Sequence, residues 1–176
     1  MLRKGLLIAA LCLLPATAQA QTVENPWELT LGAGGVNSSD FDGFAARVDG
    51  SLGYYFNETW EVSVRQSFTY NDFGGGPGGG SQLDGSTRVA LDVHFPLGDR
   101  SQWVPYVGAN IGYVYGDSVN DTWEAAPEAG IKYYVNSTTF VYFSAEYQFF
   151  FDSGDDAEDA FSDGQFLYTL GIGFRF

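Results

Sequence analysis

The chain has 176 residues and a formal net charge of −14, with 45% hydrophobic, 17% aromatic and 17% charged residues. So acidic a chain offers few cations to neutralise a phosphate backbone, which argues against nucleic-acid binding. One cysteine and one histidine cannot supply a disulfide framework or a conventional zinc site.

The first twenty residues have the three regions of a secretory signal peptide. Arg3 and Lys4 precede an apolar run over residues 6–14, and residues 18–20 read Ala-Gln-Ala, a small-residue cleavage site. The run is shorter than the roughly 20 residues of a membrane-spanning helix. Cleavage after Ala20 would also remove the one cysteine, Cys12. We therefore predict a signal peptide over 1–20 and a single domain over 21–176.

Eight segments of alternating apolar and polar residues follow. We predict strands at residues 26–35, 43–56, 60–71, 85–95, 103–115, 124–135, 139–151 and 165–176. Successive side chains of a strand point to opposite faces, so each segment has one apolar face. Lengths of about 11–14 residues are typical of tilted strands that cross a membrane.

The connections between these segments alternate in length. Residues 57–59 and 136–138 form tight turns and residues 96–102 a modest one, whereas those near 36–42, 72–84, 116–123 and 152–164 are mostly longer. Outer-membrane barrels have short periplasmic turns and longer extracellular loops, which predicts both termini on the periplasmic side. The glycine-rich stretch 74–80 lacks the Lys-Ser/Thr ending of a phosphate-binding loop and is interpreted as an outer loop.

The last segment alternates through the final residue. Its apolar face consists of Phe166, Tyr168, Leu170, Ile172, Phe174 and Phe176. This tail resembles the C-terminal signal of bacterial outer-membrane barrels, which end in Phe with aromatics at alternate positions before it. The chain is similar to the eight-stranded outer-membrane β-barrel superfamily of OmpX and the OmpA transmembrane domain.

The resemblance implies an all-β fold, an eight-stranded antiparallel up-and-down transmembrane β-barrel in the bacterial outer membrane. It also implies contact with outer-membrane lipid and lipopolysaccharide, and recognition of the C-terminal strand by the barrel-assembly machinery. Because this superfamily covers many roles, the fold carries no function across.

Two placements of the apolar face are open. A lipocalin-like soluble barrel would turn it inward. The membrane placement is favoured because the polar phase is rich in glycine, which suits a narrow lumen, and because bulky aromatics gather at strand ends as two girdles. One girdle contains Trp27, Phe56, Trp60, Phe95, Trp103 and Phe176, and the other Phe44, Tyr70, Tyr115, Phe151 and Phe166.

In the membrane placement, the inward phase carries acids and bases in near balance. The predicted lumen residues are Glu28, Arg47, Asp49, Glu61, Arg65, Arg88, Asp92, His94, Glu128, Lys132, Glu146 and Arg175. Buried charges must pair to offset their desolvation, and an eight-stranded lumen is just wide enough for side chains to fill. We therefore predict an ion-pair network that plugs the barrel. A narrow ion path along the same charges is the alternative.

Catalysis by the one histidine, His94, is disfavoured. His94 is expected to point inward near a periplasmic turn, away from lipid A in the outer leaflet, and no serine on that strand face completes a nucleophilic set. A lipid A-modifying enzyme is therefore the third hypothesis. We predict no catalytic residue, no metal site and no cofactor.

Acidic residues gather at the expected outer end, where a solvated surface is the first interpretation and weak divalent-cation binding the second. They are Asp40, Asp42, Asp72, Asp84, Asp117, Asp121, Glu124, Asp152, Asp155, Asp156, Glu158, Asp159 and Asp163. The sequence thus predicts a small non-enzymatic outer-membrane barrel with a plugged lumen and acidic extracellular loops, acting in envelope structure or surface interaction. A narrow channel for ions or small polar solutes is the alternative.

Overall fold

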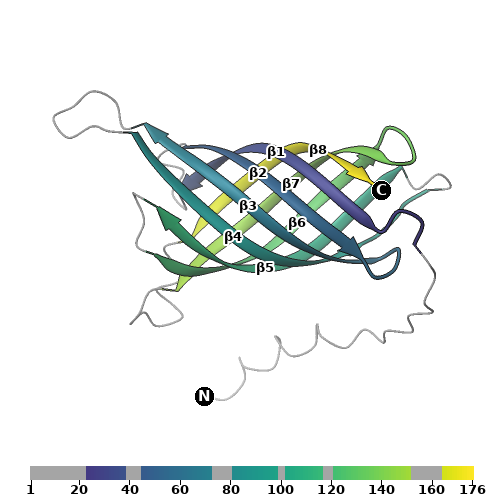
Figure 1. The fold of residues 1–176 in the computed structure, drawn as a ribbon, viewed down its shortest axis with the longest axis horizontal. Coiled ribbons are helices and arrows are strands. Elements are labelled where there is room, and N and C mark those ends of the chain that lie inside the picture. The colour runs from purple at the N-terminus through teal and green to yellow at the C-terminus, as the bar shows by residue number, and fades with distance from the viewer. Residues whose placement is uncertain (1–22, 39–44, 73–80, 99–101, 117–120, 152–163) are drawn as a thin grey trace, which may run out of the picture.

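The computed structural model describes residues 23–38, 45–72, 81–98, 102–116, 121–151 and 164–176. These residues form eight antiparallel strands that pair in chain order and close into a barrel (Figure 1). The strands are β1 (Trp27–Ser38), β2 (Ala45–Tyr55), β3 (Trp60–Asp72), β4 (Ser81–His94), β5 (Trp103–Gly116), β6 (Thr122–Tyr134), β7 (Thr139–Phe151) and β8 (Gln165–Arg175). In these ranges, no helix is long and apolar enough to cross a membrane.

The predicted fold class is confirmed, and the largest shift in strand bounds is at β4. This strand begins at Ser81 rather than residue 85, because its pairing with β3 continues to Asp72 opposite Ser81. Strand β6 likewise begins two residues earlier than predicted, at Thr122. Both hairpins therefore extend further into segments whose composition is that of loops. The predicted signal peptide lies outside the described residues.

The barrel closes between the first and last strands. Strand β8 pairs with β1 over eleven residue positions, from Glu28 opposite Arg175 to Ser38 opposite Gln165. Beyond the ladder, the amide of Trp27 donates to the carbonyl of Phe176 at 3.1 Å, and the amide of Phe176 donates to the carbonyl of Trp27 at 2.9 Å. No unpaired edge is left between β1 and β8, which is what a sheet needs to cross hydrocarbon.

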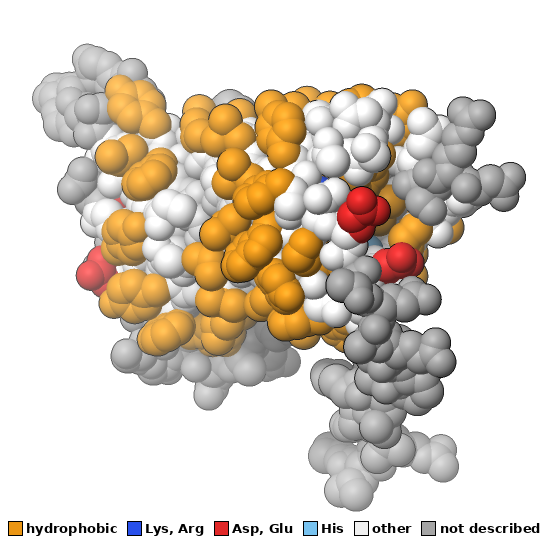
Figure 2. Space-filling view, turned by 45° about the vertical axis from the view of Figure 1, so that its right-hand side comes forward, with side chains coloured by type: hydrophobic (Ala, Val, Ile, Leu, Met, Phe, Trp, Pro, Cys, Tyr) orange, Lys and Arg blue, Asp and Glu red, His pale blue; other side chains and the backbone are white. Residues whose placement is uncertain are grey.

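The apolar phase faces outward, opposite to the placement in a lipocalin-like barrel. Leu31, Val64, Ile111 and Leu170 are all more than half exposed, and Leu170 reaches 66%. Figure 2 shows apolar side chains spread over the barrel wall, with the visible Asp and Glu side chains toward its ends. A continuous apolar surface of this extent would aggregate in water and is suited to lipid.

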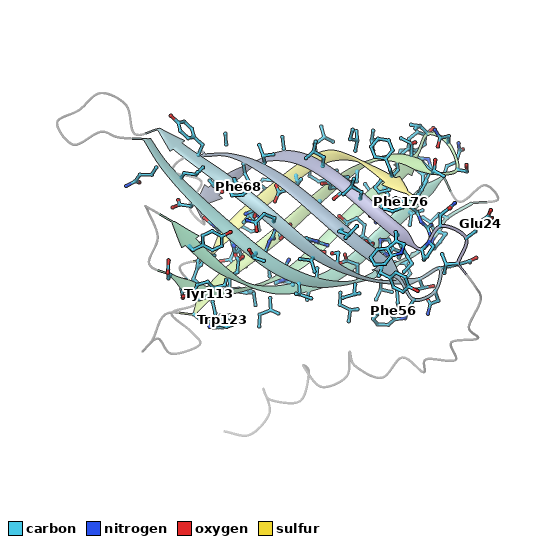
Figure 3. All side chains as sticks on the ribbon, viewed as in Figure 1. Glu24, Phe56, Phe68, Tyr113, Trp123 and Phe176 are labelled. Carbon is cyan, nitrogen blue, oxygen red and sulfur yellow. The ribbon has the colours of Figure 1, made fainter. Side chains whose placement is uncertain are left out.

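Aromatic side chains stand on this outer face near both ends of the barrel. Phe56 and Phe176 lie at one end, and Tyr113 and Trp123 lie toward the other (Figure 3). Of the residues predicted to form the girdles, Phe44 lies outside the described residues. The six apolar residues of the C-terminal strand all point outward, and Leu170, Ile172, Phe174 and Phe176 are exposed.

The barrel has two unlike ends. At the short-turn end, residues 56–59, 95–102 and 135–138 connect strands, and the segment 23–26 enters β1. Two of these turns use the same device, an asparagine side chain that accepts backbone hydrogen bonds. The Oδ1 of Asn57 accepts from the amides of Thr59 and Trp60 at 2.8 and 2.9 Å. The Oδ1 of Asn136 accepts from Thr138 and Thr139 in the same way. In outer-membrane barrels, the end with short turns faces the periplasm.

Candidate functional site

The residues predicted to line the lumen all lie in strands with their side chains away from the lipid-facing surface. Ten of the twelve are buried, and Arg65 and Arg175 are half-buried. Alternation along each strand dictates this placement, since a shift of one residue would turn the same side chains into lipid. The lumen is therefore polar and charged along the length of the barrel.

Aromatic rings, which were not among the predicted lumen residues, fill the remaining space. Tyr55, Tyr106, Phe140 and Tyr142 are buried on the inward phase. Three of these rings lie against glycines directly opposite on the neighbouring strand. Tyr106 pairs with Gly130, Phe140 with Gly173 and Tyr142 with Gly171. A Cβ at any of these glycines would overlap the facing ring, so glycine makes room for an aromatic in the lumen.

Lys132 is the centre of a cluster near the short-turn end. Its Nζ donates to Glu28 Oε1 at 2.6 Å, to Glu61 Oε2 at 3.1 Å and to the Tyr55 hydroxyl at 2.9 Å. The Tyr55 hydroxyl in turn donates to the other oxygen of Glu28 at 3.0 Å. These four residues come from β6, β1, β3 and β2, so one ammonium ties together strands from both sides of the barrel.

Aromatic rings complete the Lys132 cluster. The Nζ lies 5.4 Å from the centroid of the Tyr55 ring, 5.5 Å from that of Tyr106 and 5.1 Å from that of Phe140. His94 stacks on Tyr106 with ring centroids 5.2 Å apart. Cation–π attraction is strongest where the cation is desolvated, as it is here.

Arg65 forms the second cluster, in the middle of the barrel. Its guanidinium donates to both oxygens of Glu128, at 2.5 and 2.7 Å, and to Asp92 at 2.6 Å. Its Nε donates to the Ser63 hydroxyl at 3.1 Å. The amide of Asn110 also donates to Glu128, at 3.3 Å. The planar fork of arginine suits this bidentate arrangement.

Arg88 connects the middle cluster to the far half of the lumen. It donates to Glu146 through one terminal nitrogen and to Asp49 through the other, at 3.3 Å. Asp49 also accepts from Arg47 at 2.8 Å, and Glu146 accepts from Asn110 at 3.0 Å. The ion pairs of Arg47, Arg65 and Arg88 thus form one branched network, and those of Lys132 form a second, separate set.

Two residues that the sequence analysis assigned to the acidic outer loops belong to the barrel wall instead. Asp84 lies in β4 and Glu124 in β6, and both side chains are buried. Glu124 accepts a hydrogen bond from Ser86 and lies 3.9 Å from the Nε of Arg88. Strand β4 starts earlier than predicted and so includes Asp84, whereas Glu124 is already the first residue of the predicted strand 124–135 and lies on its inward phase.

Of the other acidic residues assigned to the outer loops, Asp121 is exposed and Asp72 ends β3. The rest lie outside the described residues. They are Asp40, Asp42, Asp117, Asp152, Asp155, Asp156, Glu158, Asp159 and Asp163.

Arg175 stands apart from the network. Its guanidinium carbon lies 4.2 Å from the centroid of the Tyr55 ring, and none of the ion pairs within the described residues includes it. It faces the short-turn end, beyond the Lys132 cluster.

The space left inside the barrel is divided. A cavity of about 40 Å³ lies in the middle, with Arg65, Arg88 and Ser144 among its lining residues. A larger cavity of about 500 Å³ lies at the short-turn end, where Tyr134 and Arg175 line it. The two cavities share no lining residue. Tyr55 lines the larger cavity, and its hydroxyl is hydrogen-bonded to Lys132 and Glu28, which line the smaller one.

His94 lies at the boundary between these two cavities. Its Nε2 lies 3.3 Å from the Tyr55 hydroxyl and 3.4 Å from Glu61 Oε2, and the residue is 1% exposed. These neighbours can orient an imidazole but include no side-chain nucleophile of the serine or cysteine type. Within the described ranges, no three His, Cys, Asp or Glu side chains are grouped to hold a metal ion.

A closed eight-stranded barrel with lipid-facing apolar residues and a charged, side-chain-filled lumen defines a transmembrane β-barrel protein. A family model described as the outer membrane protein beta-barrel domain matches residues 6–176. The chain belongs to this family and is located in the bacterial outer membrane. The resemblance stated from the C-terminal tail is thereby confirmed.

Solved structures with the same fold come from several bacteria. Neisserial surface protein A aligns with a TM-score of 0.64 and 14% identity, covering 85% of this chain and 96% of that one. OprG from Pseudomonas aeruginosa aligns at 0.61 and 14%, covering 85% and 95%. The attachment invasion locus protein Ail of Yersinia pestis aligns at 0.57 and 17%, covering 88% and 100%. No curated protein matches significantly. At these identities, the likeness shows the shared fold alone.

Proposed function

We propose that this protein is a non-enzymatic outer-membrane barrel whose lumen is plugged by side chains, and that it acts in envelope structure or surface interaction. The observation that carries the proposal is the division of the interior. The middle cavity of about 40 Å³ has room for only a few water molecules, and the Lys132 cluster stands between it and the cavity at the short-turn end.

The connectivity of the ion pairs supports a static plug. Arg65, Arg88 and Lys132 each contact carboxylates from two other strands: β4 and β6 for Arg65, β2 and β7 for Arg88, and β1 and β3 for Lys132. Opening a continuous path would separate buried charges, which costs several kcal/mol for each pair. The solvent-facing loops are then the part of the chain left for recognition.

A narrow channel is the second candidate function. Its support is that the middle cavity is lined by charged and hydroxyl side chains, and that the Arg65 side chain keeps 15% exposure. In this alternative, the same guanidinium and carboxylate groups would line an ion path.

Single-channel recording separates the two functions. We expect no discrete current steps from protein that has first been shown to be folded by a heat-dependent shift on a gel. The double variant Y55A/K132A opens only the boundary beside the large cavity, and because the Arg65 and Arg88 ion pairs still fill the lumen, it should also give no steps. Reproducible steps from the unaltered barrel would overturn the plugged lumen.

The environment of His94 supports the non-enzymatic part of the proposal. The ring is almost fully buried between Tyr55, Tyr106 and Glu61, far from the long-loop end. A substrate in the outer leaflet would have to pass the Arg65 and Arg88 ion pairs to reach it. The test is lipid A analysis by mass spectrometry in cells with and without the gene, in which we expect identical lipid A species.

Outward contacts complete the proposal. Lipid and lipopolysaccharide would contact the apolar wall, the barrel-assembly machinery would bind the β8 strand, and divalent cations would bind weakly to the acidic loops. Calcium titration calorimetry tests the last of these contacts. Heat at millimolar calcium would support it, and no heat would remove it.

A further inference from the structure

The cavity at the short-turn end has the size of a ligand site. Its volume of about 500 Å³ lies within the roughly 300–1,000 Å³ of small-molecule pockets. It is lined by the segment that enters β1 and by residues from all three short turns. The plugged lumen makes no use of this space, because the Lys132 cluster forms its floor.

Arg175 presents an unpaired cation to this cavity. Each of the other lumen cations lies within ion-pair distance of a carboxylate, but none of the described carboxylates is that close to Arg175. Its Nε is buried and has no hydrogen-bond partner in the part of the chain that the structure describes. The Tyr55 ring beneath it provides a cation–π contact but no counter-charge. A half-buried guanidinium of this kind is stabilised by an anionic ligand.

His94 provides a second, independent polar group at the same place. The residue is 1% exposed and lines the cavity, and its Nδ1 has no hydrogen-bond partner of good geometry among the described residues. Its Nε2 is already within reach of Tyr55 and Glu61. A neutral imidazole offers one donor and one acceptor, so Nδ1 remains available to a ligand.

The rim of the cavity has the opposite charge. Glu24 and Glu58 are exposed and line its mouth, while Val104 and Tyr134 supply apolar and aromatic wall. A polyanion would be repelled at this rim. A ligand with one carboxylate and one amine matches the arrangement, with the carboxylate deep and the amine at the mouth.

We propose that this cavity binds short zwitterionic peptides from the periplasm, with the peptide carboxylate on Arg175 and His94 and the amine beside Glu24 and Glu58. This proposal depends on the barrel lying in the outer membrane with its short turns in the periplasm. It does not depend on whether the lumen conducts ions. Val104 and Tyr134 offer the peptide's side chains an apolar and aromatic surface between the two ends of the ligand.

The test uses trialanine as the probe, with the folded barrel in phospholipid nanodiscs and backbone amide NMR as the readout. We expect trialanine to shift the amides of Val104, Tyr134 and Ser137. Amidation of its carboxyl end should weaken binding at least about tenfold, because a charge-assisted hydrogen bond is lost. Equal affinity of the two peptides, or no shifts at tens of millimolar trialanine, would overturn the proposal.

Variants locate the two charges separately. R175Q should weaken trialanine binding at least about tenfold, as amidation does. E58Q changes an exposed side chain that contributes nothing to the plug, so it keeps the folded barrel available if R175Q does not fold. E58Q should weaken trialanine but leave N-acetyl-trialanine, which has no amine, unchanged. If E58Q affects both peptides equally, the assigned orientation is wrong.

Discussion

Replacing Arg65 with alanine tests the energetic role of the network most directly. The guanidinium makes three hydrogen bonds of 2.5–2.7 Å to Glu128 and Asp92, whose side chains are 0% and 3% exposed. R65A leaves both carboxylates buried without their cation, a change that costs about 3–5 kcal/mol. We expect the lower part of this range, because Asn110 still donates to Glu128.

The measurement is reversible urea unfolding of the barrel in lipid vesicles, followed by tryptophan fluorescence and checked by the gel shift. The double variant R65A/E128A removes one of the stranded carboxylates and should regain part of the lost stability, a coupling that a loss of packing alone would not produce. If R65A unfolds within about 1 kcal/mol of the unaltered protein, the network does not stabilise the barrel as the buried-pair argument requires.

Two further predictions concern the wall of the barrel. G173A places a methyl group against the Phe140 ring and should cost about 1–3 kcal/mol in urea unfolding. G50A is the matched control, since only one atom lies within 4 Å of its Cβ position, at 3.9 Å, and it should be neutral or stabilising. L170R places a charge on the lipid face and should cost about 2–4 kcal/mol, whereas L97R, beside a short turn, should cost at most about 1. Equal losses in either matched pair would contradict the assigned lumen packing or membrane depth.

Alternation explains why the fold could be predicted from the sequence. Side chains of a strand alternate between two faces, so once one apolar residue is assigned to a face, the faces of its neighbours follow. A chain with eight such amphipathic strands can adopt few folds, and the transmembrane barrel is one of them. The same rule also places on the inward face the two carboxylates that were assigned to the outer loops, Asp84 and Glu124. Counting back in steps of two from Glu128 reaches Glu124, and from Arg88 reaches Asp84. Their local composition points instead to loops, because these strand ends adjoin acidic and polar loop segments.

The pairing inside the lumen could not be predicted in this way. Lys132 and Glu28 are 104 residues apart, and their contact depends on the stagger of eight strands and on side-chain rotamers. The ring partners of the glycines were missed for a related reason. That Phe140 lies against Gly173 depends on the register between β7 and β8, which alternation within either strand leaves open.

The Lys132 cluster has a consequence for how the barrel moves. Its hydrogen bonds, ring contacts and stacking pairs draw residues from all eight strands, with Arg175 joining through Tyr55. A strand cannot loosen at this level without exposing an ammonium or a carboxylate to an apolar surrounding. Local fraying is therefore suppressed, and the amides around this ring should exchange with solvent hydrogen together, through opening of the whole barrel. The short-turn half of the barrel should therefore open as a single cooperative unit.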